Sequence, residues 1–262
     1  MLAFPSMGGR ALTNWLTISL MTALIVMWQT AAYVLGAAYV PTPIATATEA
    51  VAQLSGGPVL GHLAATSVGL LYGFLLAAVA GLAVGLTLGL SRKLYETYEP
   101  LVMTLYALPK LVIYPVFLFV FGFAVSGRAW FAMTIGMFPI MIFAMDGTRS
   151  VDPVLLNVGR AFGLSRFRLF RAIILPAALP SIVSGLRLGV GTTLGGVVLA
   201  EFISSPAGIG FALSQAVLLG NVLRIYALVM IVVALAVGLN VVLRWFEAQA
   251  LPARRQARLD VV

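Results

Sequence analysis

The stretch GRAFGLSRFRLFRAIILPAALP, residues 159–180, gathers positive charge in a chain that is otherwise mostly apolar. Phenylalanines and leucines alternate with its cations, and Gly163 interrupts the run. We expect a short helix before Gly163 and a second one after it, with Ser165 as the N-cap. Exposed aromatic residues among cations are typical of a surface that docks another protein. The four arginines have no carboxylate in the stretch to pair with: Arg160, Arg166, Arg168 and Arg171.

Few other residues are suited to catalysis or metal binding. His62 is the single histidine and there is no cysteine, which excludes disulfides, thiol catalysis and Cys/His zinc sites. The chain has no phosphate-binding loop of the type G-x-x-x-x-G-K-[ST], so it does not hydrolyse ATP alone. A membrane enzyme is therefore a weak alternative, because no carboxylates cluster in the apolar segments.

Two charged residues in apolar surroundings are candidates for a translocation path. Lys110 follows Pro109 within an apolar stretch, where a lysine at mid-bilayer depth costs about 2.5–3.5 kcal/mol. Either it meets an anionic solute, or Pro109 ends an interfacial helix and Lys110 reaches the inner headgroups. Glu201 precedes a Ser-Pro-Gly turn, and it either lines the mouth of the path or anchors a helix end in water.

These residues must be positioned by membrane-spanning helices. The chain is 61% hydrophobic and 9% charged, whereas soluble domains are about 25% charged. About 20 apolar residues cross the hydrocarbon layer. We therefore expect one all-α integral membrane domain over residues 1–262, with six transmembrane helices at about 12–37, 63–90, 101–123, 129–145, 182–200 and 225–243. The first is too long for a signal peptide, so we expect it to be retained.

Charged residues orient these spans. With the N-terminus inside, the outer loops receive only Arg128 and Arg224, and the remaining loop cations lie inside. This asymmetry predicts a multi-pass protein with both termini in the cytoplasm. It also explains the net charge of +8 without nucleic acid as a partner.

The connections differ in character. The outer segment PTPIATATEAVAQLSGG, beginning at Pro41, predicts a short helix on the outer membrane surface. The loop over residues 146–180 is the longest inner one and contains the arginine stretch. The second span carries small residues at every fourth position, which allow close helix packing in lipid: Gly69, Gly73, Ala77, Gly81, Gly85 and Gly89. Gly185, Gly189, Gly191 and Gly195 give the fifth span a similar smooth surface.

The segment GLSRFRLFRAIILPAALP resembles the signature loop of the inner-membrane permeases of ABC importers. That signature is Glu-Ala-Ala, three residues, Gly, nine residues, Ile, one residue and Leu-Pro. Gly163, Ile173, Leu175 and Pro176 match it, but Asn157 stands where the family has its glutamate. The segments VPTPIATATEAV, LPKLVIYPVFLFVFG, TRSVDPVLLNVGRAFG and LAEFISSPAGIGF resemble the nitrate/sulfonate/taurine branch.

The resemblance implies a type I ABC importer permease fold, with a cytoplasmic coupling helix between spans 4 and 5. It implies the bacterial inner membrane as location, two ABC ATPase subunits, a second permease copy (the same chain or a relative) and a periplasmic solute-binding protein as partners. The permease binds no cofactor, and ATP and Mg²⁺ act on the ATPase subunits. On this basis the expected docking loop comprises Asn157, Gly159, Arg160, Ala161, Phe162, Gly163, Leu164, Ser165, Arg166, Arg168, Ile173, Leu175 and Pro176.

The expected function is that of the non-catalytic transmembrane subunit of an ATP-driven importer. The branch implies a small, anionic solute such as nitrate, a sulfonate, taurine or a related organic acid. The alternative is a secondary, ion-coupled transporter without an ATPase. Such transporters often show internal repeats and several buried acids, neither of which is evident in this sequence.

Overall fold

The computed structural model describes residues 9–56, 59–122 and 125–250, and all regular structure in these ranges is helical. The chain divides into two compact units. The first comprises Met1–Pro58 and Gln215–Ile231, and the second comprises Val59–Ser214 and Val232–Val262. The expectation of a single domain over the whole chain stays a prediction.

The first unit contains α1 (Gly9–Leu35) and α2 (Pro43–Gly56). The connection between them is fixed at Trp28, whose indole Nε1 donates a hydrogen bond to the carbonyl of Pro41 at 3.0 Å. Helix α2 starts with a side-chain cap, because Thr42 Oγ1 accepts the N–H of Ala45 at 3.2 Å. The helix predicted after the Pro-Thr-Pro turn is therefore confirmed, whereas its place on the membrane surface stays a prediction.

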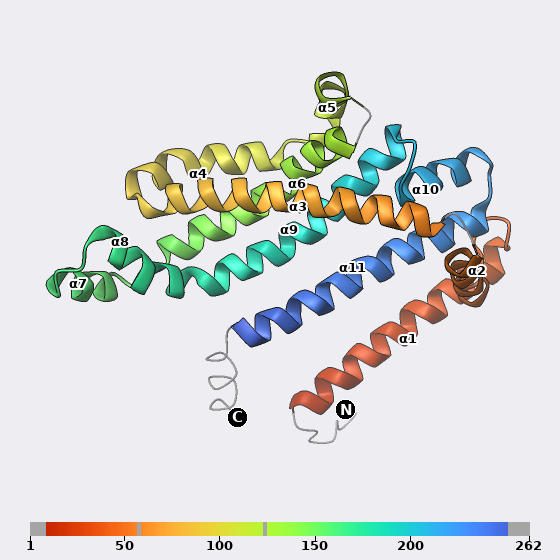
Figure 1. Cartoon of the computed structure of the whole chain (residues 1–262). Coiled ribbons are helices and arrows are strands. Elements are labelled where there is room, and N and C mark those ends of the chain that lie inside the picture. Colours follow the sequence, from red (N-terminus) through yellow and green to blue (C-terminus); the bar gives the residue numbers. More distant parts are fainter. Residues whose placement is uncertain (1–8, 57–58, 123–124, 251–262) are drawn as a thin grey trace. The chain divides into compact units, whose positions relative to one another are not determined.

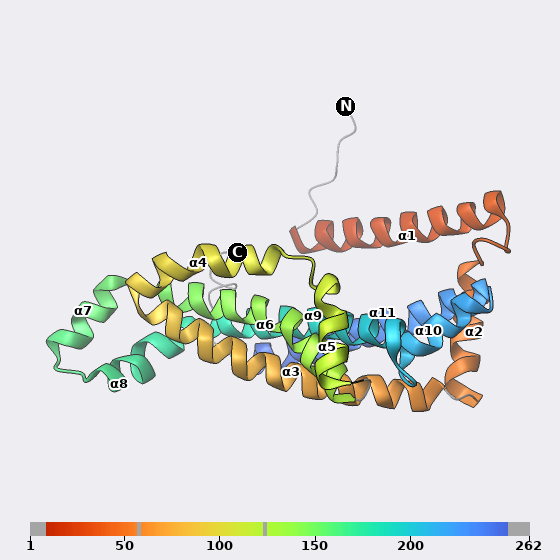
Figure 2. The same cartoon turned by 90° about the horizontal axis from the view of Figure 1, so that it is seen from above.

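Three long helices form the core of the second unit: α3 (Val59–Leu90), α6 (Val125–Arg149) and α9 (Leu175–Ser204). They lie side by side in both views (Figures 1 and 2), and α6 packs against the other two. Their apolar side chains meet in small clusters, one of which joins Leu70, Ala132 and Leu194. All predicted docking and path residues lie in the second unit, on these three helices or on the segments that connect them.

The small residues of α3 explain the tight packing of α3 against α6 and α9. A Cβ atom on Gly81 would lie 2.7 Å from the carbonyl oxygen of Met137, and Gly85 and Gly89 meet the α6 backbone at least as closely. Real side chains do not tolerate such separations, so the small residues let the helix backbones touch. A Cβ atom on Gly73 would lie 3.2 Å from that of Ala132, which is tight but less severe. The predicted packing role of this ridge is confirmed.

The third predicted span is broken rather than continuous. It consists of α4 (Arg92–Ala107), the 3₁₀ turn η1 (Lys110–Ile113) and α5 (Tyr114–Phe121), with a bend of 79° at the break. Pro109 causes the break, because it has no N–H for the helix and forces the preceding residue into an extended conformation. Leu108 has ψ 136°, as this effect requires.

Five helices of the described ranges are long and apolar enough to cross a membrane, or six if the bent pair counts as one span. The last of them is α11 (Val222–Ala250). A short apolar helix, α10 (Ile209–Leu218), precedes it where the sequence indicated only a turn. The loop predicted to be an inner one holds α7 (Pro153–Ala161) and α8 (Arg166–Leu169), which form a hairpin beyond the ends of α3, α6 and α9 (Figure 1).

Candidate functional site

Helix α7 is short but has a well-defined beginning. Asp152 is the N-cap, and its Oδ1 accepts the N–H of Val154 at 2.8 Å. Pro153 occupies the first helical position, where its fixed φ favours the helix and its missing N–H is not needed. Asn157 Oδ1 accepts a hydrogen bond from Arg160 Nη1 at 3.2 Å, so these two side chains pair on one face of α7.

Gly163 ends α7 in a Schellman motif. The N–H of Leu164 binds the carbonyl of Gly159 at 3.1 Å, and the N–H of Gly163 binds that of Arg160 at 2.9 Å. This geometry places Gly163 at φ +71°, in the left-handed region that favours glycine. The next helix begins at Ser165, whose Oγ accepts the N–H of Arg168 at 3.4 Å. The predicted pair of helices with an N-cap at Ser165 is confirmed.

The outer surface of this hairpin is both apolar and basic. Phe162 is 82% exposed and Phe167 is 69% exposed. Three ion pairs occur among the described residues, and none includes an arginine of the hairpin. The predicted docking residues on the surface are Asn157, Arg160, Ala161, Phe162, Gly163, Ser165, Arg166, Arg168 and Pro176. Leu164, Ile173 and Leu175 are half-buried, and Gly159 is buried.

Gly159 is buried because the hairpin closes on it. A Cβ atom there would lie 2.5 Å from Leu169 Cδ1 and 2.8 Å from Ile173 Cδ1. Leu164 approaches the same point, which is the apolar contact that accompanies a Schellman cap. The hairpin is thus packed internally around Gly159.

The hairpin continues into α9 without a break. Residues Phe170–Ile174 form a π-helical turn, η2, and α9 begins directly afterwards at Leu175. The sequence predicted a loop up to residue 180 and a fifth span from about 182, but Pro176 and Pro180 both lie within this helix. The wider π turn accommodates the missing N–H of Pro176, because one turn of the usual hydrogen-bond ladder is already displaced.

Lys110 turns back onto the end of α4. Its Nζ donates to the carbonyls of Tyr106 at 2.6 Å, and of Leu105 and Leu108 at 3.3 Å each. It also lies 4.7 Å from the ring centroid of Phe138. These carbonyls have no helical N–H partner, and a cation at a helix C-terminus is favourable. The contacts support a capping role, and a place for Lys110 on the path stays a prediction.

Glu201 is fully buried, although both interpretations of the sequence placed it at a water-exposed mouth or end. Its Oε1 lies 3.2 Å from Arg128 Nη1, and Arg128 itself is 4% exposed. Its Oε2 accepts hydrogen bonds from Thr66 Oγ1 at 2.7 Å and from Gly210 N–H at 3.2 Å. The burial weighs against Glu201 as a path residue, and that role stays a prediction.

The same network fixes the connection between α9 and α10. Arg128 Nη1 donates to the carbonyl of Ala207 at 3.0 Å, and His62 Nδ1 accepts the N–H of Gly208 at 3.2 Å. Gly208 has φ +112°, and a Cβ atom there would overlap the carboxylate of Glu201. The sequence placed Arg128 in an outer loop, but it lies within α6, is 4% exposed and pairs with Glu201, 73 residues further along the chain. The polar network joins the starts of α3 and α6 to the end of α9.

The two ends of the core therefore differ in charge. At the hairpin end, the hydroxyl of Tyr95 donates to Asp146 Oδ1 at 3.0 Å and ties α4 to α6. That end carries exposed cations on the helix ends and the hairpin: Arg92, Lys93, Arg149, Arg160, Arg166, Arg168 and Arg171. At the opposite end Arg128 is buried and neutralised by Glu201.

Comparison with known proteins identifies the family. Residues 73–255 match the family described as the binding-protein-dependent transport system inner membrane component. The putative aliphatic sulfonates transport permease protein of Bacillus subtilis is 31% identical over 79% of this chain and 76% of its own length. The nitrate import permease protein of Leptolyngbya laminosa is 27% identical over 69% of this chain and 64% of its own length.

A solved structure shares the fold. A chain of the MetNI methionine ABC transporter, in an inward-facing conformation, matches with a TM-score of 0.66 and 18% identity, covering 73% of this chain and 95% of that one. None of these comparisons supports the alternative of an ion-coupled secondary transporter. The family match and the all-helical, multi-span fold agree: the chain belongs to the inner-membrane components of binding-protein-dependent transport systems, the permease subunits of ABC importers.

Proposed function

We propose that this permease lies in the bacterial inner membrane with both termini in the cytoplasm and conducts a small anionic solute inward. The charge distribution supports this orientation, because exposed cations gather at the hairpin end of the core and cytoplasmic loops are rich in arginine and lysine. The printed names of the relatives, which refer to aliphatic sulfonates and nitrate, support an anionic solute. A periplasmic binding protein delivers that solute to the opposite end.

The exposed surface of the α7–α8 hairpin is the observation that carries this proposal. It presents Phe162 and Phe167 beside arginines that have no carboxylate partner in the described part of the chain. An aromatic side chain that is 82% exposed in a cytoplasmic loop is suited to insert into a hollow of another protein. The chemistry of this surface fits an acidic, partly apolar groove on each of two ATPase subunits.

The chain transmits motion rather than performing catalysis. ATP and Mg²⁺ act on the ATPase subunits, and this chain with its second copy, identical or related, forms the path. Nucleotide binding shifts the assembly between inward-open and outward-open states by the difference in affinity for the two. Movement of the docked hairpin passes directly into α9, because α8, η2 and α9 form one helix from Arg166 to Ser204.

Cross-linking from a single introduced thiol tests the docking surface. The chain contains no cysteine, so Phe162→Cys gives one reactive site on the hairpin. Phe119→Cys is the matched control, because Phe119 is 94% exposed on α5, far along the chain from the hairpin. We expect a bifunctional thiol reagent to join the Phe162→Cys variant to the co-expressed ATPase subunit in membranes and to leave the Phe119→Cys variant unlinked.

The same variants address orientation and coupling. A membrane-impermeant thiol reagent added to intact spheroplasts is expected to spare the Phe162→Cys variant. Labelling of that variant from outside, or equal cross-linking of the two variants, would refute the proposal. We also expect Gly163→Trp to reach the membrane but to lose ATP-dependent solute uptake, since the hairpin turn requires φ +71°.

A further inference from the structure

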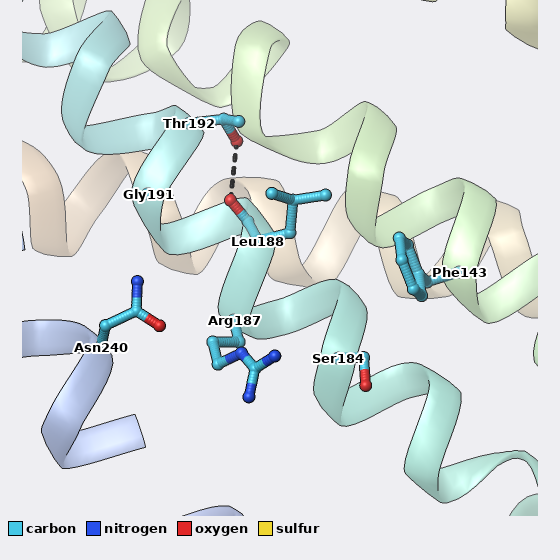
Figure 3. Close-up of a pocket in the computed structure, with 7 residues that line it drawn as sticks. All are labelled: Phe143, Ser184, Arg187, Leu188, Gly191, Thr192 and Asn240. Carbon is cyan, nitrogen blue, oxygen red and sulfur yellow. Dashed lines mark hydrogen bonds between the residues drawn. The ribbon is translucent and has the colours of Figure 1, made fainter. Parts of the chain in front are cut away.

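A groove runs between α9 and the C-terminal half of α11 in the second unit. Its volume is about 570 Å³, within the range of small-molecule sites. Figure 3 shows Arg187 and Thr192 on α9 and Asn240 on α11 around the same opening. The groove is lined by Phe143, Ser184, Arg187, Leu188, Gly191, Thr192 and Asn240.

Arg187 is the charged residue of this lining, and it lies inside an apolar span. Its Nη1 donates to Glu247 Oε2 at 2.8 Å, and its side chain is 33% exposed. A guanidinium has five N–H donors, and Glu247 receives the single hydrogen bond that Arg187 makes within the described residues. An ionised arginine in a membrane span is expensive, so its remaining donors need a polar partner in the groove.

Asn240 provides a second donor. Its side chain is exposed on α11, in an apolar span, and makes no hydrogen bond among the residues that the structure describes. Ser184 and Thr192 contribute less, because their hydroxyls already donate to the carbonyls of Pro180 and Leu188. The donors that face the groove are therefore one guanidinium and one amide, which suits an oxyanion.

Gly191 keeps the groove open. A Cβ atom on Gly191 would meet no atom within 4 Å, whereas one on Gly185 would lie 2.6 Å from Phe143 and one on Gly189 would lie 2.5 Å from Ile140. We expected all these glycines to form one packing surface, but only the latter two touch α6 in this way. Packing within the chain does not account for Gly191.

We propose that this groove binds the transported oxyanion, a sulfonate, nitrate or carboxylate group of a soluble solute. Arg187 supplies the positive charge and Asn240 a neutral donor. The carboxylate of Glu247 occupies Arg187 in the absence of solute and leaves it when the solute arrives. This inference rests on the proposed import function and assigns the solute class to particular residues.

Charge-selective labelling tests the groove without knowledge of the natural solute. The assembled transporter carries Gly191→Cys, or Gly61→Cys as control, since Gly61 also faces open space but lies at the start of α3. Each introduced thiol reacts with an anionic sulfonatoethyl or a cationic trimethylammonioethyl methanethiosulfonate. At about 6 Å in water a unit charge changes each rate about threefold, in opposite directions. Because Glu247 compensates part of the charge of Arg187, we expect the anion-to-cation rate ratio to be higher for Gly191→Cys than for Gly61→Cys, with about tenfold as the limit for an uncompensated charge.

Three further variants, each combined with Gly191→Cys, locate that charge. Arg187→Gln is expected to return the ratio to that of the Gly61→Cys control, and Arg92→Gln, in an exposed ion pair, to leave it unchanged. Glu247→Gln is expected to raise the ratio further, because Arg187 is then uncompensated. Equal ratios for the two introduced thiols would overturn the site, and an unchanged ratio in Glu247→Gln would overturn the carboxylate exchange.

Protection experiments separate a soluble solute from lipid. In phosphatidylcholine nanodiscs, ethanesulfonate or nitrate is expected to slow labelling of the Gly191→Cys variant. Protection by added phosphatidylglycerol alone would instead assign the groove to a lipid headgroup and overturn the proposal.

Uptake of ethanesulfonate and nitrate into proteoliposomes connects the groove to transport. Gly191→Leu is expected to lower uptake at least tenfold while the ATPase subunit still co-purifies and hydrolyses ATP. Unchanged uptake, or loss of the permease dimer, would overturn the groove as a solute site. Failure of the ATPase to co-purify with the unmodified chain would instead refute the import function, whatever the labelling ratios.

Discussion

The buried pair of Glu201 and Arg128 offers the sharpest test of the fold. We consider Glu201→Gln, which keeps the side-chain shape but removes the charge. Glutamate presents oxygens to both sides, Oε1 toward Arg128 and Oε2 toward Thr66 and Gly210. Glutamine has one oxygen, so its NH₂ group must face donors on one side. Arg128, 4% exposed, is also left without a counter-charge.

The size of the effect follows from this burial. Removing one partner of a buried ion pair costs about 3–5 kcal/mol, because the other charge stays desolvated. For a chain of 262 residues this lowers the apparent melting temperature by roughly 6–20 °C. Arg128→Met should cost a similar amount. The double variant removes both charges and replaces the pair by less polar groups, so it should lose less than the two single variants added together.

The assay is heat-induced loss of monodisperse protein in detergent, followed by size-exclusion chromatography at a fixed heating rate. Arg92→Gln is the control, because its pair with Glu96 has side chains that are 74% and 55% exposed. Such a pair contributes about 0.3–0.5 kcal/mol. If Glu201→Gln shifts the melting temperature as little as the control, or if the single losses simply add, the network does not stabilise the bundle as argued.

Three further outcomes follow from the geometry. Gly163→Ala should lower the stability of the hairpin by about 1–2 kcal/mol. The added Cβ meets no atom, so this cost comes from φ +71° alone. Faster proteolysis of the hairpin checks this, and an unchanged cleavage rate would contradict it. Gly85→Leu should abolish the folded monomer, because its side chain would push α3 away from Met141 on α6. Gly195→Leu faces open space and should fold. Equal yields of the two variants in fluorescence size-exclusion profiles would contradict the close α3–α6 contact. Tyr114→Phe loses hydrogen bonds to Ala200 and Ser204 and should lower the melting temperature by about 2–4 °C, and no shift would show that these bonds contribute nothing.

Local chemistry made much of the bundle and the hairpin predictable. Apolar segments of sufficient length located the five long helices, and small residues at every fourth position located the α3–α6 contact. Gly163 and Ser165 marked the turn of the hairpin because a left-handed cap favours glycine and an N-cap favours serine. In each case the deciding interactions lie within a few residues or follow directly from helical periodicity.

Long-range pairing was not predictable in the same way. Arg128 and Glu201 lie near opposite ends of different spans, and only the antiparallel packing of α6 and α9 brings them together. A signal was nevertheless present, because a chain with 8 acidic residues has few reasons to place one inside an apolar segment. The contacts of Lys110 were not predictable for a related reason. The carbonyls that it binds become available only because Pro109 ends α4.

The separation of the buried pair along the chain has a consequence for how the protein is made. Arg128 leaves the ribosome 73 residues before Glu201. At about 5–20 residues per second this is a delay of roughly 4–15 s. During that interval Arg128, near the N-terminus of the newly inserted α6, has no counter-charge from Glu201. It can remain among lipid phosphates. The polar network around Glu201 and Arg128 therefore forms only after α9 has entered the bilayer, which makes it a late step in biogenesis.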